Sequence, residues 1–247
     1  MIVNEIRSRS VLSKSKVHEY TVNPYVGCGH GCSYCYARFM KRWTGHKEAW
    51  GDFVDVKVNA PELLEHEIKR KRVGRVWVSG ICDPYQPIEQ KYRLTRRCLE
   101  ILVRHQWPVT IQTKSPLAVR DIDLLRDSKE VEVGFTITTA DEEIRKIFEP
   151  SAPPIEGRIK ALAAFDSAGI KTFAMIAPLL PGAENLAVQL RGKVDYVLID
   201  RMNYHYADHI YRRHGLEHAM SDDFLAGQTS LLATALRKEG TPVHILF

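Results

Sequence analysis

Hydrophobic residues along the chain follow two spacings, and together these predict a repeating series of strands and helices. Short apolar runs typical of buried strands lie at residues 17–26, 75–79, 109–113, 131–138, 171–177 and 194–199. Apolar residues at helical spacing predict helices at residues 61–71, 93–105, 121–126, 155–168, 184–190 and 222–238. Pro61 begins one of these helices and Gly169 follows another, as is typical of helix boundaries. A terminal strand is expected at residues 243–247.

This order of elements predicts at least six strand–helix units, which pack as a parallel sheet or barrel. A chain of 247 residues with 45% hydrophobic residues is long enough for one large α/β domain or two small ones. Because no shift in composition marks a boundary, we expect a single domain over residues 1–247. Its core is expected at about residues 17–200 and a C-terminal helical cap at about residues 201–247.

Three of the five cysteines lie in one stretch, NPYVGCGHGCSYCYAR, at residues 23–38. Cys28, Cys32 and Cys35 form a Cys-x3-Cys-x2-Cys array, and thiolates favour zinc, copper(I) or iron-sulfur clusters. An odd number of cysteines fits a disulfide framework poorly. A structural zinc ion would need a fourth ligand, for which His30 is the candidate within the loop. Three cysteines on a [4Fe-4S] cluster would instead leave one iron open.

The cysteine array resembles that of the radical S-adenosylmethionine (SAM) superfamily, and its surroundings, NPYxGCxxxCxYCYA, resemble the branch related to spore photoproduct lyase. Further segments that resemble this branch are DPYQPIE at 83–89, RDIDLL at 120–125 and RxxxEP at 145–150. The resemblance covers roughly residues 20–182 and implies a partial (β/α)6 TIM-type barrel. It also implies a [4Fe-4S] cluster on Cys28, Cys32 and Cys35. SAM would bind the open iron, and its reductive cleavage would give a 5′-deoxyadenosyl radical that abstracts hydrogen from a substrate.

The carboxyl ends of the strands carry the candidate SAM contacts, because catalytic and binding groups lie there in parallel barrels. Ser79 and Asp83, after the second strand, can accept hydrogen bonds from the methionyl ammonium of SAM. Lys114, after the third strand, can hold the SAM carboxylate. Thr136 and Thr138 share one face of the fourth strand, where hydroxyls can bind the ribose. Each assignment has an alternative. The loop with Ser79 and Asp83 could be an ordinary turn, Lys114 could be exposed to solvent, and Thr136 and Thr138 could be strand residues without a function.

Cys82 lies beside Asp83 at the expected mouth of the barrel. Most cysteines are small apolar core residues, but spore photoproduct lyase is thought to use a cysteine in this neighbourhood to return a hydrogen atom to a substrate radical. Tyr34 and Tyr36, which flank Cys35, resemble tyrosines proposed for the same relay. The resemblance therefore predicts Cys82, Tyr34 and Tyr36 as catalytic residues, with Tyr34 also contacting the cofactor.

The chain is mildly basic, with a formal net charge of +5, which is compatible with a nucleic-acid partner without requiring one. The densest basic patches, at residues 69–75 and 93–97, can equally be solvated helix ends. Residues 200–220 combine aromatic and basic side chains, which suit stacked bases and phosphates or a helix that caps the barrel. Asn203, Tyr204 and His205 are the candidates there for substrate contact.

The N-terminal stretch lacks the apolar core of a secretory signal, and no run reaches the roughly 18 apolar residues of a membrane span. We therefore expect a cytoplasmic, monomeric protein that receives electrons from a donor such as flavodoxin or ferredoxin. Three functions stay open: a spore photoproduct lyase-like lyase acting in DNA repair or on another nucleotide, a radical SAM enzyme for a peptide or small molecule, and a non-enzymatic metal protein that binds nucleic acid. Spore photoproduct lyase is longer and has a DNA-opening hairpin, which we do not identify in this sequence.

Overall fold

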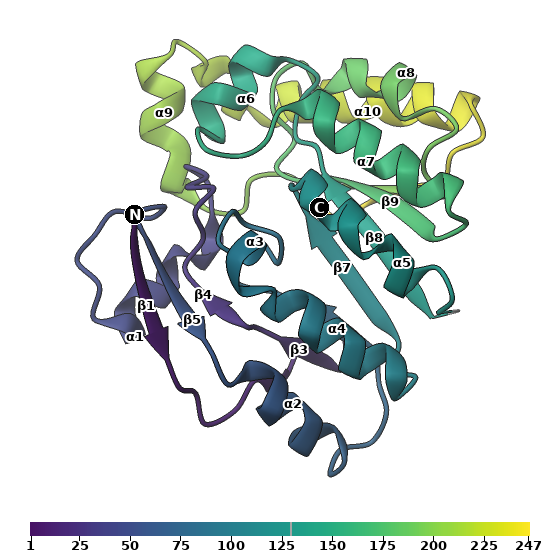
Figure 1. Ribbon diagram of the computed structural model, residues 1–247. Helices are drawn as coiled ribbons and strands as arrows, with labels where there is room; N and C mark the ends of the chain where they lie inside the picture. Colours follow the sequence, from purple (N-terminus) through teal and green to yellow (C-terminus); the bar gives the residue numbers. More distant parts are fainter. Residues whose placement is uncertain (129) are drawn as a thin grey trace.

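The computed structural model describes residues 1–128 and 130–247, and a mainly parallel eight-stranded sheet lies at its centre (Figure 1). The order across the sheet is β11, β10, β9, β8, β7, β6, β3 and β2, and only β2 at one edge runs antiparallel to its neighbour. Within the described residues, β2 and β11 do not pair, so the barrel stays open. The expected partial α/β barrel is confirmed. The strands are β2 (Leu12–Lys14), β3 (Tyr20–Val22), β6 (Val76–Val78), β7 (Val109–Thr113), β8 (Val131–Thr136), β9 (Lys171–Ile176), β10 (Tyr196–Ile199) and β11 (Val243–Ile245).

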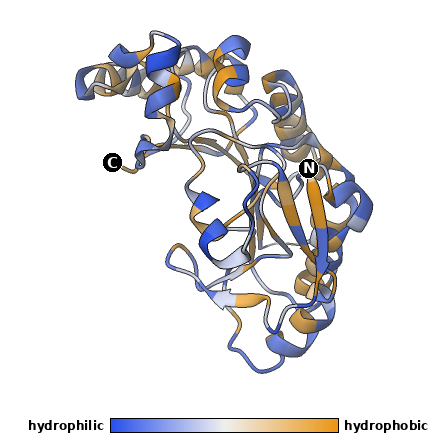
Figure 2. Ribbon diagram, turned by 90° about the vertical axis from the view of Figure 1, so that its left-hand side faces the viewer, coloured by the Kyte–Doolittle hydropathy of each residue, from blue (hydrophilic) through white to orange (hydrophobic). Residues whose placement is uncertain are grey.

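Helices follow most of these strands and cover one face of the sheet (Figure 1). Each buries an apolar stripe. In α4, for example, Leu94, Cys98 and Leu102 are buried, which confirms Cys98 as a core residue. Figure 2 shows the mixture of hydrophilic and hydrophobic residues expected of helices with one buried face. The α-helices are α1 (Lys41–Thr44), α2 (Ala60–Ile68), α3 (Glu89–Tyr92), α4 (Leu94–Arg104), α5 (Ile122–Leu125), α6 (Glu142–Phe148), α7 (Ile155–Ser167), α8 (Leu186–Leu190), α9 (Asp208–Arg213) and α10 (Asp222–Lys238). None of the helices in the described residues is long and apolar enough to cross a membrane.

A second, three-stranded sheet was not predicted from the sequence. It contains β1 (Ile2–Ile6), β5 (Phe53–Lys57) and β4 (Tyr25–Val26), in the order β1, β5, β4. The single strand expected at residues 17–26 is therefore wrong: Asn23 and Pro24 separate β3 from β4, and the chain changes sheets between them. Since β4 leads directly into the cysteine loop, the small sheet forms the base of that loop.

Residues 201–247 form two separate parts. The 3-10 helices η4 (His205–Ala207) and η5 (Glu217–Met220), together with α9, pack against α6 through an apolar cluster that includes Phe148, Leu180 and Tyr211. By contrast, α10 packs beside α8, and β11 joins the central sheet. The first part thus corresponds to a cap, and the second completes the barrel wall. The other 3-10 helices are η1 (Tyr36–Met40), η2 (Pro116–Asp121) and η3 (Ala183–Asn185).

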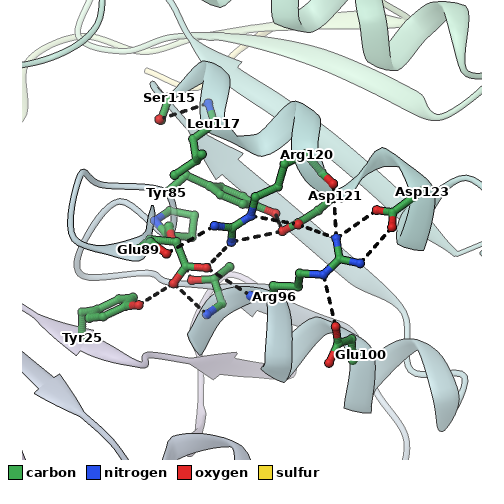
Figure 3. Close-up of polar contacts among 12 residues, drawn as sticks. Tyr25, Tyr85, Glu89, Arg96, Glu100, Ser115, Leu117, Arg120, Asp121 and Asp123 are labelled. Atoms are coloured by element: carbon green, nitrogen blue, oxygen red, sulfur yellow. Dashed lines mark hydrogen bonds and ion pairs between the residues drawn. The ribbon is translucent and has the colours of Figure 1, made fainter. Parts of the chain in front are cut away.

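A buried ion network fixes the loop that follows β6 (Figure 3). The Glu89 carboxylate is fully buried and accepts hydrogen bonds from the Tyr25 hydroxyl and the Arg120 guanidinium. Arg120 also donates to Asp121 Oδ1 at 3.0 Å. Asp121 Oδ2 accepts a hydrogen bond from the Tyr85 hydroxyl at 2.9 Å. The DPYQPIE and RDIDLL segments are therefore bonded to each other, and Glu89 ties both to the strand that precedes the cysteine loop.

Candidate cofactor site

The cysteine loop is a tight, largely buried turn between β4 and η1. Cys28 and Cys32 are each 7% exposed, and backbone hydrogen bonds link Gly31 N to Cys28 O at 3.3 Å and Cys35 N to Cys32 O at 3.2 Å. A Cβ atom on Gly27 would lie 2.4 Å from the Phe53 carbonyl oxygen, so the backbones of the loop and β5 touch. Glycine is required at this position, where φ is +85°.

The three thiols of the loop are not gathered around one point. Among residues 1–128 and 130–247, no three His, Cys, Asp or Glu side chains are grouped to hold one metal ion. Cysteines that each bind a different iron do not need to meet at one point. The buried His30 side chain lies beside Asp83, with 3.3 Å between its Nε2 and Asp83 Oδ2. Burial raises the pKa of Cys32 to about 12 and that of Cys28 well above its usual range. Ligand binding must therefore displace protons.

Lys114 lies at the end of β7 and faces the cysteine loop. Its side chain is 14% exposed, and its Nζ lies 3.9 Å from Glu149 Oε1 and 5.5 Å from the centre of the Tyr34 ring. Burial alone would lower the pKa of Lys114, but the neighbouring Cys32 and Glu149 raise it above its ordinary value. Lys114 is thus a buried cation beside the loop rather than a solvent-exposed lysine.

Glu149 is the centre of the hydrogen-bond network behind the loop. Its carboxylate is fully buried, and Oε1 accepts from the Tyr34 hydroxyl and, at 3.0 Å, from Thr138 Oγ1. The other oxygen pairs with Arg158 at 2.5 Å. Burial alone would raise the pKa of Glu149, but the cations Arg158 and Lys114 lower it below its ordinary value. A buried carboxylate therefore links the cysteine loop, the segment that follows β8, and α7.

The RxxxEP segment, to which the sequence assigned no role, holds this network in place. Arg145 donates to the carbonyl oxygens of Glu149 at 2.8 Å and Ala152 at 3.0 Å. The same segment also bonds to the cysteine loop, because Ser33 N donates to Phe148 O at 2.9 Å. Arg145 and Glu149 are functional candidates that the sequence marked only by resemblance.

Asp83 is already well supplied with partners. Its carboxylate accepts hydrogen bonds from Lys114 N at 2.7 Å, Thr113 Oγ1 at 2.6 Å and Tyr85 N at 2.8 Å. Burial alone would raise its pKa, but His30 and these donors lower the pKa of Asp83 to about 2. By contrast, the buried Ser79 hydroxyl has no hydrogen-bond partner in the part of the chain that the structure describes. Ser79 also has a φ of +64°, which is unusual for a residue other than glycine.

The predicted relay residues separate into two places. Tyr36 donates its hydroxyl hydrogen bond to the Gly80 carbonyl, and Cys82 Sγ donates to the Tyr25 carbonyl at 3.6 Å. Burial raises the pKa of Cys82 to about 12, so the thiol keeps its S–H at neutral pH. Tyr34 instead bonds to Glu149. The structure therefore brings Tyr36 to the loop that carries Cys82, and Tyr34 to the buried Glu149 carboxylate.

The two predicted ribose contacts also have protein partners. Thr136 Oγ1 accepts from Gln112 Nε2 at 3.1 Å, and Thr138 donates to Glu149. Gln112, on β7, was not singled out from the sequence. One hydrogen-bonding capacity of each hydroxyl stays open: the Thr136 O–H can still donate, and the Thr138 oxygen can still accept.

Aromatic side chains from η1 and from the segment after β10 stack on the outer side of the cysteine loop. The Tyr36 and Tyr204 rings are 6.3 Å apart at an interplanar angle of 20°, and the Tyr204 and Tyr206 rings are 5.7 Å apart at 11°. Arg38 lies 5.0 Å above the Tyr206 ring, and Tyr204 is 51% exposed. These residues form an exposed aromatic and basic surface.

Two arginines of the basic patch at residues 93–97 are paired with acids. Arg96 bonds to Asp121 and Asp123, each at 2.8 Å, and Arg97 to Glu62 at 3.0 Å. Of the other candidates near the aromatic surface, Asn203 donates to Asp200 and His205 lies 3.1 Å from Asp208. The arginines on α4 therefore support the interpretation of that patch as an ordinary helix surface.

Comparison with known proteins places this site in a family. The model of the radical SAM superfamily matches residues 22–185. An uncharacterized protein of Methanocaldococcus jannaschii is 38% identical over 180 residues, which cover 72% of this chain and 67% of that protein. A radical SAM Nalpha-GlyT isomerase of Pseudomonas phage M6 is 25% identical over 178 residues, covering 71% of this chain and 35% of the isomerase. The matched part of the chain thus spans only about a third of the phage enzyme.

The fold is similar to that of spore photoproduct lyase complexed with dinucleoside spore photoproduct, with a TM-score of 0.72 and 17% identity over 99% of this chain and 82% of the lyase. A mutant of that lyase with bound AdoMet and the same dinucleoside gives a TM-score of 0.66 at 17% identity, over 99% of this chain and 81% of that one. At this identity the similarity concerns the fold. Since the family model matches more than half of the sequence, the chain belongs to the radical SAM superfamily, whose members use a [4Fe-4S] cluster and SAM.

Proposed function

We propose that the protein is a radical SAM enzyme whose cluster is held by Cys28, Cys32 and Cys35, and that it acts on nucleic acid in the manner of spore photoproduct lyase. The observation that carries this proposal is the meeting of three elements: the buried cysteine loop, the Lys114 cation behind it, and the protonated Cys82 thiol. When bound at this site, the cluster and SAM would supply the radical chemistry that removes a hydrogen atom from the substrate.

Residues at the strand ends would bind and orient SAM. Lys114, which lies beside Glu149, would pair with its carboxylate. The Ser79 hydroxyl, which has no partner among residues 1–128 and 130–247, would accept from its ammonium. For Asp83, whose oxygens are occupied, we propose a supporting role in which it fixes the backbone of Lys114. Thr136 and Thr138 would contact the ribose through the open capacity of their hydroxyls.

Cys82 would return a hydrogen atom after the substrate has rearranged. Its S–H bond breaks, the hydrogen atom passes to the substrate radical, and a Cys82 thiyl radical is left. Tyr36, whose hydroxyl bonds to the loop that carries Cys82, would resupply that hydrogen atom. The tyrosyl radical left on Tyr36 would return to tyrosine by taking one electron from the flavodoxin or ferredoxin donor and one proton from solvent. Tyr34 is part of the Glu149 network and would hold the cysteine loop beside the cofactor.

The aromatic and basic surface formed by Tyr36, Tyr204, Tyr206 and Arg38 supports the proposed substrate class. Planar rings beside a guanidinium suit stacked bases and a phosphate. The similar lyase was solved with a dinucleoside spore photoproduct, which supports a lyase reaction in DNA repair as the first candidate. A peptide or small-molecule substrate is the competing outcome of the test.

Anaerobic reconstitution tests the proposal. We expect about four irons per chain and 5′-deoxyadenosine from SAM with dithionite, with flavodoxin or ferredoxin able to replace dithionite. Dinucleoside spore photoproduct should then be converted, and the Cys35→Ala variant should lose iron and SAM cleavage while Cys98→Ala keeps both. A protein that binds one zinc ion and never cleaves SAM would contradict the proposal. SAM cleavage without conversion of nucleic acid would overturn its substrate.

A further inference from the structure

The structure assigns a tuning role to Trp50, which no sequence motif marked. We propose that the indole N–H of Trp50 donates a hydrogen bond to Cys35 Sγ and thereby raises the reduction potential of the cluster. This inference rests on the proposed assignment of Cys35 as a cluster ligand. It concerns how easily the cluster accepts an electron, and it is independent of the substrate.

The segment that carries Trp50 is packed tightly against the cysteine loop. A Cβ atom on Gly51, whose φ is +110°, would lie 2.8 Å from the Gly31 Cα, so the two backbones meet with room for glycine alone. The Trp50 ring meets the Phe53 ring edge to face, with centroids 5.9 Å apart. Phe53 belongs to β5, and the backbone of β5 also touches Gly27 at the start of the loop. Trp50 is therefore held between a strand and the loop.

A second side chain pins the same segment. His46 stacks on Phe53, with ring centroids 4.0 Å apart, and its Nε2 lies 2.9 Å from Asp55 Oδ1. Its Nδ1 lies 2.9 Å from Glu48 Oε2. These contacts fix the turn that ends at Trp50, so the direction of the indole N–H is set by packing.

The indole N–H has no conventional acceptor. Trp50 Nε1 is buried and has no hydrogen-bond partner among residues 1–128 and 130–247. Buried donors are rarely left without an acceptor, because desolvation without a partner costs about 1–3 kcal/mol. The Trp50 indole and the Ala37 backbone N–H both influence the Cys35 thiol as hydrogen-bond donors, so the acceptor we assign to the indole is Cys35 Sγ once it is a cluster-bound thiolate. Burial raises the pKa of Cys35, and both of these donors act in the opposite direction.

Cys35 differs in this respect from the other two cysteines. After burial, charged groups and neighbouring thiols are the main influences on the pKa of Cys28 and Cys32, with Asp83 first for Cys28 and Lys114 first for Cys32. Of these three cysteines, Cys35 is the one whose pKa has hydrogen-bond donors among its main influences. A hydrogen bond to a ligating sulfur stabilises the reduced cluster more than the oxidised one, because reduction adds negative charge. Trp50 therefore makes reduction easier.

Trp50→Phe tests this, because it keeps an aromatic ring and removes the N–H. In the reconstituted protein without SAM, spectroelectrochemical titration should show a lower midpoint potential. At a fixed applied potential, the ratio of oxidised to reduced cluster should rise by up to about tenfold. For a one-electron couple, a tenfold change corresponds to a shift of about 59 mV in the midpoint potential. Trp43→Phe is the matched control, since Trp43 is 69% exposed, and it should leave the potential unchanged. An unchanged potential in Trp50→Phe with full iron content would overturn the inference.

A measurement on the unmutated protein covers the case in which Trp50→Phe loses its cluster. We expect pulsed electron paramagnetic resonance of the reduced cluster to detect a ¹⁵N coupling in protein labelled with ¹⁵N-indole tryptophan, and Trp43→Phe to keep it. An intact reduced cluster without this coupling would refute the inference. Failure of the proposed function looks different, because the unmutated protein would then hold no four-iron cluster.

Discussion

Tyr34 donates a hydrogen bond to Glu149 and so joins the cysteine loop to the segment after α6. The two residues are 115 positions apart in the sequence. Glu149 lies between this hydroxyl and the buried Arg158 guanidinium, which places a complete ion pair directly behind the loop. The geometry of the cofactor site therefore depends on a charge that does not bind the cofactor.

Replacing Glu149 with glutamine should destabilise the protein strongly. Arg158 is fully buried, and without the carboxylate its remaining partners are the Pro153 and Thr136 carbonyl oxygens. Breaking a buried ion pair typically costs about 3–5 kcal/mol, and we expect a loss of about 3 kcal/mol in the free energy of unfolding by urea. Glu143→Gln, at a 77% exposed carboxylate paired with Lys146, should change it by less than about 1 kcal/mol. Equal effects of the two substitutions would argue against this role.

Lys114→Met should weaken SAM binding without removing the cluster. Losing a hydrogen bond to a charged group costs about 1.5–3 kcal/mol, so the Kd for SAM should rise roughly 10- to 100-fold. Equilibrium dialysis on the reconstituted protein measures this. Lys171→Met is the control, because Lys171 begins β9 at the amino end of the barrel. If both variants bind SAM like the unmutated protein, Lys114 does not hold the carboxylate.

Cys82→Ala should separate SAM cleavage from productive turnover. Since Cys82 is proposed to act only after hydrogen abstraction, 5′-deoxyadenosine should still form while correct repair of dinucleoside spore photoproduct falls at least about tenfold. Iron content should not change. Cys98→Ala removes a buried thiol on α4 and should keep the product distribution. Loss of the cluster in Cys82→Ala would show that Cys82 is a ligand instead.

Asp83 should make the unfolding free energy of the cluster-free protein depend on acid pH. Its folded pKa of about 2 lies below the ordinary value of 3.8, so its stabilisation is fully present above about pH 4 and is lost as pH falls toward 2. The shift corresponds to about 2 kcal/mol. The unmutated protein and Asp83→Asn should therefore differ less in their free energy of unfolding at pH 3 than at pH 5, as measured by urea unfolding. Asp127→Asn is the control, because the Asp127 side chain is 86% exposed, and its free energy of unfolding should equal that of the unmutated protein at both pH values. A constant difference for Asp83→Asn would contradict this assignment.

Local patterns were sufficient to predict most of the barrel and the position of the cysteine loop. Strands such as β7 and β8 have clear apolar patterns, and parallel packing brings their carboxyl ends together. The pairing of β1 with β5 was not predictable in this way, because Ile2 and Phe53 are far apart in the sequence and β1 is largely exposed. Nothing in either short segment specifies the other as its partner.

Side-chain partners were the least predictable part of the site. Asp83 was assigned to SAM from its chemistry and position, but its place in the fold surrounds it with donors from Thr113, Tyr85 and Lys114. The role of Glu149 and the direction of the Trp50 indole depend likewise on contacts between distant segments. A sequence indicates which chemical groups are available, and the packed structure decides which of them are already occupied.

The small sheet has a consequence for where the protein can be divided. The region that matches the family model, residues 22–185, contains β4 and β5 but neither β1 nor the strands β10 and β11. A fragment cut at those limits would expose the edge of β5 beside the cysteine loop and remove one wall of the barrel. The segment that matches the family model is therefore smaller than the unit that we expect to fold. A chimeric protein that carries this candidate cofactor site should include the chain from β1 through β11.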